Sequence, residues 1–156
     1  MIDVAVPGVG DPAPSFSALG TGDRTYSLDD YSGSPLVLVF YPGDATPVCT
    51  QQLLQYNEGL DKLAQLDARV LAMSPQDIAS HEKFQADHSF AFPLLYDEDR
   101  QIAEKYGVIG PLGFYRRSVF VIDANGIIRY ASRSTAGLTY PSVDKIVEAL
   151  SFNTNL

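Results

Sequence analysis

Cysteine is almost missing from this chain of 156 residues, in which Cys49 is the only one. One thiol cannot form a disulfide within the chain. This excludes a disulfide-stapled secreted scaffold and favours a cytoplasmic location. Histidine is also scarce, with only His81 and His88 present. No standard zinc-ligand spacing exists, and we expect no metal and no cofactor.

Positive charge is in short supply as well. The chain has 11 Lys and Arg against 19 Asp and Glu, which gives a net charge of −8. Such a chain repels phosphate backbones and anionic lipid surfaces, so we expect neither a nucleic acid nor a membrane partner. The longest apolar run, 36–41, is too short to span a bilayer. The N-terminus lacks the cationic start and apolar stretch of a secretory signal.

The residues that are present suit a compact globular protein. Hydrophobic residues make up 46% of the chain. That proportion, at this length, predicts a single domain over 1–156 with a full apolar core. We expect the polar segment 151–156 to be a disordered tail.

Periodicity and turn signals predict alternating strands and helices. A hairpin is expected from 15–19 and 24–27, followed by buried strands at 36–41 and 69–74 and a short strand at 92–96. A second hairpin joins 118–123 to 127–132. Helices are expected at 47–66, 76–88, 100–106 and 141–150. This order predicts an α/β fold with a mixed central β-sheet flanked by helices and an N-terminal β-hairpin.

Cys49 lies just beyond the buried strand 36–41. Pro42 ends that strand, Thr46 is a good N-cap, and Pro47 suits the first helical position. Cys49 therefore falls in the first turn of a helix, where partial positive charge favours a thiolate. Ligands also bind at this end of strands in open α/β sheets. The alternative is a buried structural cysteine.

A fixed cation would complete such a site. Arg116 and Arg117 directly precede the strand 118–123. A guanidinium at that strand end can reach a neighbouring strand-to-helix junction, where it would stabilise a thiolate and polarise an oxygen substrate. The alternative for both arginines is a solvated surface pair.

Taken together, these motifs resemble the peroxiredoxins of the AhpC/TSA family. The signature Pro-x-x-x-Thr-x-x-Cys is formed by Pro42, Thr46 and Cys49. The stretch TPVCT most resembles the bacterioferritin-comigratory, or Q-type, subgroup. The family arginine stands in R-x-x-F-x-I-D, which selects Arg117 over Arg116. Gln52 fills the position where the family often has Glu or Gln. The resemblance, which runs from about 10 to 150, implies a thioredoxin-like fold.

The resemblance also implies a thiol-dependent peroxidase that reduces hydrogen peroxide and organic hydroperoxides. Such an enzyme would have an antioxidant role in cell redox homeostasis. The Cys49 thiolate would attack the terminal peroxide oxygen and become a sulfenic acid. Arg117 and the backbone N–H groups near Val48 and Cys49 would stabilise the departing oxygen. Thr46 would hydrogen-bond the thiolate and the peroxide, and Pro42 would shield the site.

Other side chains receive simpler interpretations. Gln52 is expected to contact the catalytic residues and hold them in place without touching the substrate. Tyr41 is assigned to the core or to the mouth of the pocket. His81 and His88 lie on one predicted helix and are expected at the surface. Asp97 is expected to start a helix.

The chain departs from many Q-type relatives at Leu54, where they carry a resolving cysteine. The cycle is therefore expected to use one cysteine and an external thiol, which is thioredoxin, glutaredoxin or a low-molecular-weight thiol. Two other classes stay open. One is a thiol-disulfide oxidoreductase, which usually needs the Cys-x-x-Cys that Gln52 interrupts. The other is a non-enzymatic thioredoxin-like binding or chaperone module. A monomer and a homodimer are both compatible with the sequence.

Overall fold

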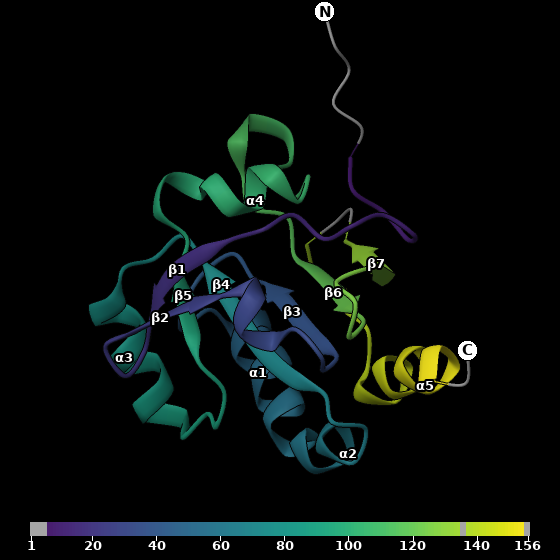
Figure 1. The fold of residues 1–156 in the computed structure, drawn as a ribbon. Helices are drawn as coiled ribbons and strands as arrows, with labels where there is room; N and C mark the ends of the chain where they lie inside the picture. The colour runs from purple at the N-terminus through teal and green to yellow at the C-terminus, as the bar shows by residue number, and fades with distance from the viewer. Residues whose placement is uncertain (1–5, 135–136, 155–156) are drawn as a thin grey trace, which may run out of the picture.

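Seven strands form one mixed sheet in residues 6–134 and 137–154, which the computed structural model describes (Figure 1). The strands are β1 (Ser17–Gly20), β2 (Arg24–Ser27), β3 (Leu36–Phe40), β4 (Arg69–Ser74), β5 (Leu94–Tyr96), β6 (Ser118–Ile122) and β7 (Ile128–Arg133). Their order across the sheet is β2-β1-β5-β4-β3-β6-β7. Strands β3, β4 and β5 are parallel, and the other pairs are antiparallel. The predicted mixed sheet and N-terminal hairpin are confirmed.

Helices and short 3₁₀ turns connect the strands. The helices are α1 (Pro47–Glu58), α2 (Leu60–Ala64), α3 (Ile78–His88), α4 (Gln101–Lys105) and α5 (Val143–Thr154), and the 3₁₀ turns are η1 (Leu28–Tyr31), η2 (Glu98–Arg100) and η3 (Pro111–Gly113). Asp97 starts the segment that leads into α4, as expected, because its carboxylate accepts two backbone N–H groups of that helix.

Several boundaries differ from the sequence prediction by one or two residues, and two differences are larger. The single helix expected over 47–66 is two helices, because Gly59 ends α1. A Cβ on Gly59 would lie 2.7 Å from both γ-carbons of Val143, so only glycine lets α5 pack this closely. The disordered tail expected over 151–156 is wrong for 151–154, which continue α5. Residues 155–156 lie outside the described residues.

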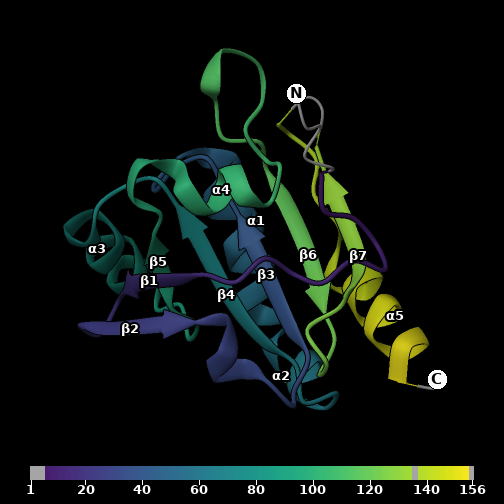
Figure 2. The ribbon, with the colours of Figure 1, turned by 45° about the horizontal axis from the view of Figure 1, so that its top comes forward.

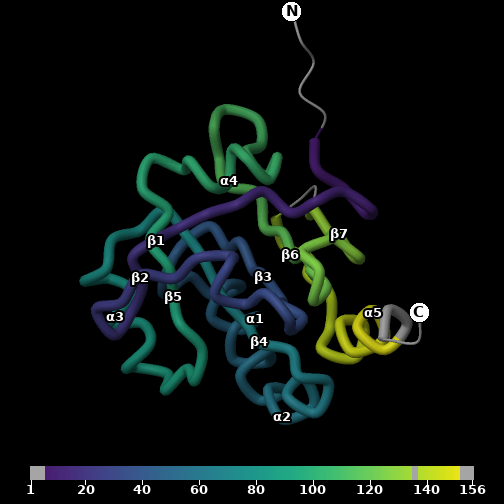
Figure 3. The backbone as a smooth tube through the Cα atoms, viewed as in Figure 1, coloured from purple at the N-terminus to yellow at the C-terminus, as the bar shows by residue number. Residues whose placement is uncertain are grey.

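Both faces of the sheet are covered, which explains why β3 is apolar throughout and β6 is apolar after Ser118. Residues of α1, α2, α3 and α5 pack on one face, and residues of α4 pack on the other (Figure 2). The segment before β1 crosses the α4 face from β7 to the opposite edge (Figure 3), where Phe16 joins the core. All five residues of β3 and all five of β6 are buried.

The strand register places the candidate site. Strands β3 and β6 run antiparallel with Phe40 opposite Ser118. The carboxyl end of β3 therefore lies beside the start of β6, and the residues just beyond these two ends come together although they are far apart in sequence. These are the Tyr41–Cys49 segment and Arg117.

Candidate active site

Cys49 occupies the first turn of α1, as the sequence predicts. Thr46 is the N-cap residue with extended backbone angles, and Pro47 is the first helical residue. The first bond of the helix runs from the Thr50 N–H to the Thr46 carbonyl, at 2.9 Å. The N–H groups of Val48 and Cys49 thus belong to the turn that has no partner within the helix.

The Thr46 side chain does not cap the helix. Its hydroxyl donates a hydrogen bond to the Gly43 carbonyl at 3.2 Å, and no side-chain capping bond is formed. The expected position of Thr46 is therefore confirmed, but the expected capping bond is wrong. Thr46 is exposed and Pro42 is half-buried, so both reach the protein surface.

Arg117 binds directly to the thiol sulfur. Its Nη2 group donates to Cys49 Sγ at 3.2 Å, Nη1 donates to Gln52 Oε1 at 2.6 Å, and Nε donates to the Gly137 carbonyl at 2.8 Å. All three nitrogens of the guanidinium are thus in use. The side chain is buried, which removes the solvated-surface alternative for Arg117.

Gln52 connects the guanidinium to the segment that leads into α5. It lies one turn after Cys49 on the same face of α1, and its Nε2 group donates to the Tyr56 hydroxyl at 3.3 Å. Tyr56 in turn donates to the Pro141 carbonyl at 2.7 Å. Burial raises the pKa of Tyr56, so its hydroxyl keeps its proton and remains a donor. Gln52 was expected to have a supporting role, whereas Tyr56 was not among the predicted site residues, although the i, i+4 spacing of the two residues was a usable signal.

The sulfur lies deep in the protein. Cys49 has 0% exposure and belongs to the core cluster between the sheet and α1. The guanidinium of Arg117 and the N-terminus of α1 both place positive charge beside the sulfur. The sulfur therefore has a cation within hydrogen-bond distance in an environment where water screens charge weakly.

A second polar cluster lies behind the loop that follows β3. Tyr41 does not line a pocket mouth: it is fully buried, and its hydroxyl donates to Asp44 Oδ1 at 2.7 Å. His81 also has 0% exposure, so its expected surface position is wrong. The imidazole lies 2.7 Å from Asp44 Oδ2. A polar side chain on an amphipathic helix reads as exposed unless its buried partner is known, and Asp44 is that partner.

Two kinds of feature are absent from the described ranges. Within 6–134 and 137–154, no group of three or more His, Cys, Asp and Glu side chains could hold a metal ion. In the same ranges, no helix is long and apolar enough to cross a bilayer.

Known proteins resemble this chain in sequence. Residues 9–131 match the AhpC/TSA family. Peroxiredoxin Bcp of Bacillus subtilis is 35% identical over 126 residues, which cover 76% of this chain and 80% of the relative. The chloroplastic peroxiredoxin Q of rice (Oryza sativa subsp. japonica) is 34% identical over 123 residues. That match covers 78% of this chain but only 57% of the rice protein.

Solved structures agree with the sequence matches. A cysteine-to-serine mutant of Xylella fastidiosa PrxQ superposes with a TM-score of 0.88 at 27% identity and covers 97% of this chain and 99% of the other. The bacterioferritin comigratory protein of Xanthomonas campestris gives 0.79 at 29% identity, with 88% and 91% covered; that study concerned alkyl peroxide reduction. The fold is therefore the thioredoxin-like fold of these proteins, as the sequence predicted.

Proposed function

The chain belongs to the AhpC/TSA family, and from that premise we propose that it is a thiol-dependent peroxidase of the Q type. The observation that carries the proposal is the bond from Arg117 Nη2 to Cys49 Sγ at 3.2 Å. It places a fixed cation on the one thiol of the chain, at a helix N-terminus. A thiol that only fills core volume has no need of a buried guanidinium, whose desolvation is costly.

The proposed reaction begins with the Cys49 thiolate. The sulfur attacks the terminal oxygen of a hydroperoxide, the S–O bond forms, and the O–O bond breaks. The electron pair of that bond leaves with the other oxygen, which takes up a proton to give water or an alcohol, and the sulfur becomes a sulfenic acid. Negative charge grows on the leaving oxygen. Arg117 and the free N–H groups of Val48 and Cys49 are the donors available to stabilise it.

Thr46 and Pro42 are assigned to the peroxide side of the site. Because the Thr46 hydroxyl donates a hydrogen bond to the Gly43 carbonyl, its oxygen lone pairs are free to accept a hydrogen bond from the peroxide O–H. Pro42 has no N–H, so it covers the site without offering a competing donor. Gln52 holds Arg117 in place through the 2.6 Å bond.

Recycling requires a thiol from outside the chain, because Cys49 is the only cysteine. The thiol condenses with the sulfenic acid to give a mixed disulfide and water, and a second thiol releases Cys49. Since the sulfur is fully buried, the segment around it must move before a thiol reaches it. We propose thioredoxin, glutaredoxin or a low-molecular-weight thiol as the reductant. Hydrogen peroxide and organic hydroperoxides, which include alkyl peroxides, are the proposed substrates.

The test is peroxide consumption with dithiothreitol as reductant, for wild type, Cys49→Ser and Arg117→Ala. The proposal expects rapid turnover in wild type, none above background in Cys49→Ser, and a large loss in Arg117→Ala. Wild-type turnover no faster than dithiothreitol alone would overturn the enzyme assignment and favour a thioredoxin-like binding module.

A further inference from the structure

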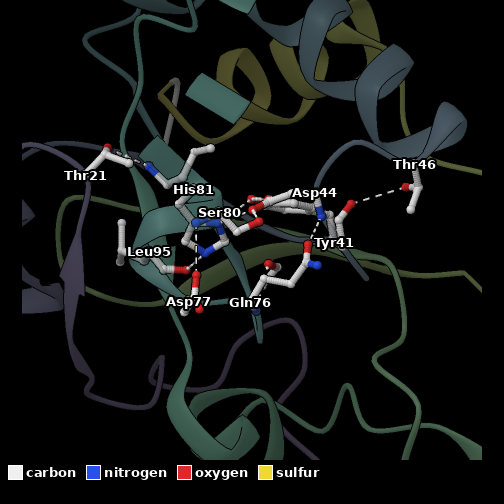
Figure 4. Close-up of polar contacts among 12 residues, drawn as sticks. Thr21, Tyr41, Asp44, Thr46, Gln76, Asp77, Ser80, His81 and Leu95 are labelled. Atoms are coloured by element: carbon white, nitrogen blue, oxygen red, sulfur yellow. Dashed lines mark hydrogen bonds and ion pairs between the residues drawn. The ribbon is translucent and has the colours of Figure 1, made fainter. Parts of the chain in front are cut away.

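The carboxylate of Asp44 is held from three sides by side chains that the reaction does not use (Figure 4). Tyr41 donates to Oδ1 at 2.7 Å, and Ser80 donates to Oδ2 at 2.7 Å. His81 Nδ1 lies 2.7 Å from the same Oδ2 atom. The backbone N–H of Asp44 also donates to the Gln76 side chain. One loop residue is thus bound to the residue that follows β3 and to the first turn of α3.

The hydrogen bonds of His81 fix the number of protons in this cluster. Its Nε2 atom lies 2.9 Å from the Leu95 carbonyl. A carbonyl only accepts, so Nε2 carries a hydrogen. A second proton then lies between Nδ1 and the Asp44 carboxylate. The contact between these two groups is therefore a charge-assisted hydrogen bond in a site closed to water. Burial by itself raises the pKa of Asp44, but the hydrogen bonds from His81, Tyr41 and Ser80 outweigh it and lower that pKa.

The loop that Asp44 belongs to has a strained conformation. The next residue, Ala45, has a φ of 62°, in the left-handed region that residues with a Cβ rarely adopt. Ala45 is exposed, so contacts of its own side chain do not hold it there. The strain is maintained by its two neighbours, which are Asp44 on one side and Thr46, the first residue of the helix cap, on the other.

We propose that Asp44 and His81 form a clasp that positions Cys49 for its reaction with peroxide. Both are positioning residues, since neither touches the sulfur. The guanidinium of Arg117 and the sulfur of Cys49 are positioned by different parts of the fold. Arg117 is held by its place just before β6 and by its bond to the Gly137 carbonyl, whereas the start of α1, with Cys49 and Thr46, directly follows the loop that the clasp holds. Loss of the clasp would therefore shift the sulfur and the Thr46 hydroxyl relative to the guanidinium.

The experiment compares two second-order rate constants of Cys49 in Asp44→Ala, His81→Leu and wild type. One is the rate constant for oxidation by hydrogen peroxide, which requires the sulfur, the Thr46 hydroxyl and the Arg117 guanidinium to be correctly placed relative to one another. The other is alkylation by iodoacetamide, which needs only an accessible thiolate. The inference rests on the proposed function and expects the peroxide constant to fall by about ten- to a hundredfold. The alkylation constant should stay the same or rise.

Asp123→Ala is the matched control. Asp123 accepts two backbone N–H groups and the Arg129 side chain, and it lies just beyond β6, at the end of that strand away from Arg117. Its loss costs comparable hydrogen bonds without touching the clasp, so the ratio of the two constants should match wild type. Asp44→Asn is the conservative variant: an amide can still bind Tyr41 and a neutral His81, and it should retain part of the peroxide reactivity that Asp44→Ala loses.

The outcomes separate the two proposals. A slow peroxide reaction in wild type overturns the proposed function. A fast wild type with unchanged peroxide constants in folded Asp44→Ala and His81→Leu overturns the clasp alone. The clasp is also overturned if Asp123→Ala changes the ratio as much as they do. If Asp44→Ala does not fold, Asp44→Asn and Ser80→Ala provide the same comparison with milder changes.

Discussion

Replacement of Arg117 by lysine tests whether the site needs a charge or a guanidinium. Lysine keeps the positive charge, but its single ammonium nitrogen cannot replace three nitrogens that bind Cys49, Gln52 and Gly137 at 3.2, 2.6 and 2.8 Å. A lysine that stays on Gln52 leaves the sulfur without its donor, and one that stays on the sulfur leaves the Gln52 oxygen unpaired. The two side chains are not interchangeable at such a position.

The magnitude follows from the bonds that are lost. Removal of one preorganised donor to a developing negative charge costs about 10²–10³ in rate, or about 2.7–4 kcal/mol of transition-state stabilisation. A lost hydrogen bond to a charged group costs about 1.5–3 kcal/mol of stability. We therefore expect Arg117→Lys to slow the oxidation of Cys49 by about a hundredfold or more and to lower the free energy of unfolding by about 2 kcal/mol.

Rapid-mixing measurement of Cys49 oxidation by hydrogen peroxide in a single turnover gives the first quantity, because it excludes the recycling thiol. Urea unfolding gives the second. Arg116→Lys is the control, since it makes the same substitution at the adjacent residue, which is half-buried and contacts neither Cys49 nor Gln52 in the described structure. A rate for Arg117→Lys within about threefold of wild type, well short of the loss that a missing donor causes, would refute the need for the guanidinium geometry. An equal loss in Arg116→Lys would refute its assignment to Arg117.

Three further predictions concern acid stability, helix packing and over-oxidation. Because the folded pKa of Asp44 lies below its unfolded value of about 3.9, its network stabilises the protein above that pH and is lost as the pH falls through the folded pKa. Wild type should therefore lose more stability than Asp44→Asn between about pH 5 and pH 3 in urea titrations; parallel curves would contradict this. Gly59→Ala would place a methyl group 2.7 Å from the Val143 side chain, and calorimetry should show a loss of about 1–3 kcal/mol. Excess peroxide should convert Cys49 to the sulfinic acid, since no second cysteine intercepts the sulfenic acid; intact-mass spectra should show a gain of two oxygen atoms with loss of activity, and full activity at unchanged mass would contradict it.

The sequence was sufficient for features that depend on neighbours along the chain. The apolar run of β3, the proline that follows it and the Thr46-Pro47 start of α1 are local signals, so the position of Cys49 at a helix N-terminus was predictable. The hairpins and the parallel centre of the sheet followed from the order of elements. The family motif, rather than periodicity, selected Arg117 over Arg116.

The boundaries that failed depended on packing. Gly59 is a recognised helix terminator, but the helical spacing around it favoured one long helix. The close approach of Val143, which requires glycine at this position, is a tertiary contact that the sequence does not show. The polar composition of 151–154 suggested disorder, whereas those residues extend α5. At Gly59 the contact with Val143 of another helix outweighed the local preference.

Only the tertiary structure decided which polar side chains meet inside the protein. Residues Cys49 and Arg117 are 68 positions apart and Asp44 and His81 are 37 apart, so no periodicity relates the members of either pair. A histidine on a helix reads as exposed because burying an imidazole is unfavourable without partners. The fold brings Asp44 and the Leu95 carbonyl to the two ring nitrogens of His81. The sequence thus determined that the Cys49 thiol lies at a helix N-terminus. The packing of distant strands and helices determined the charges and hydrogen bonds around it.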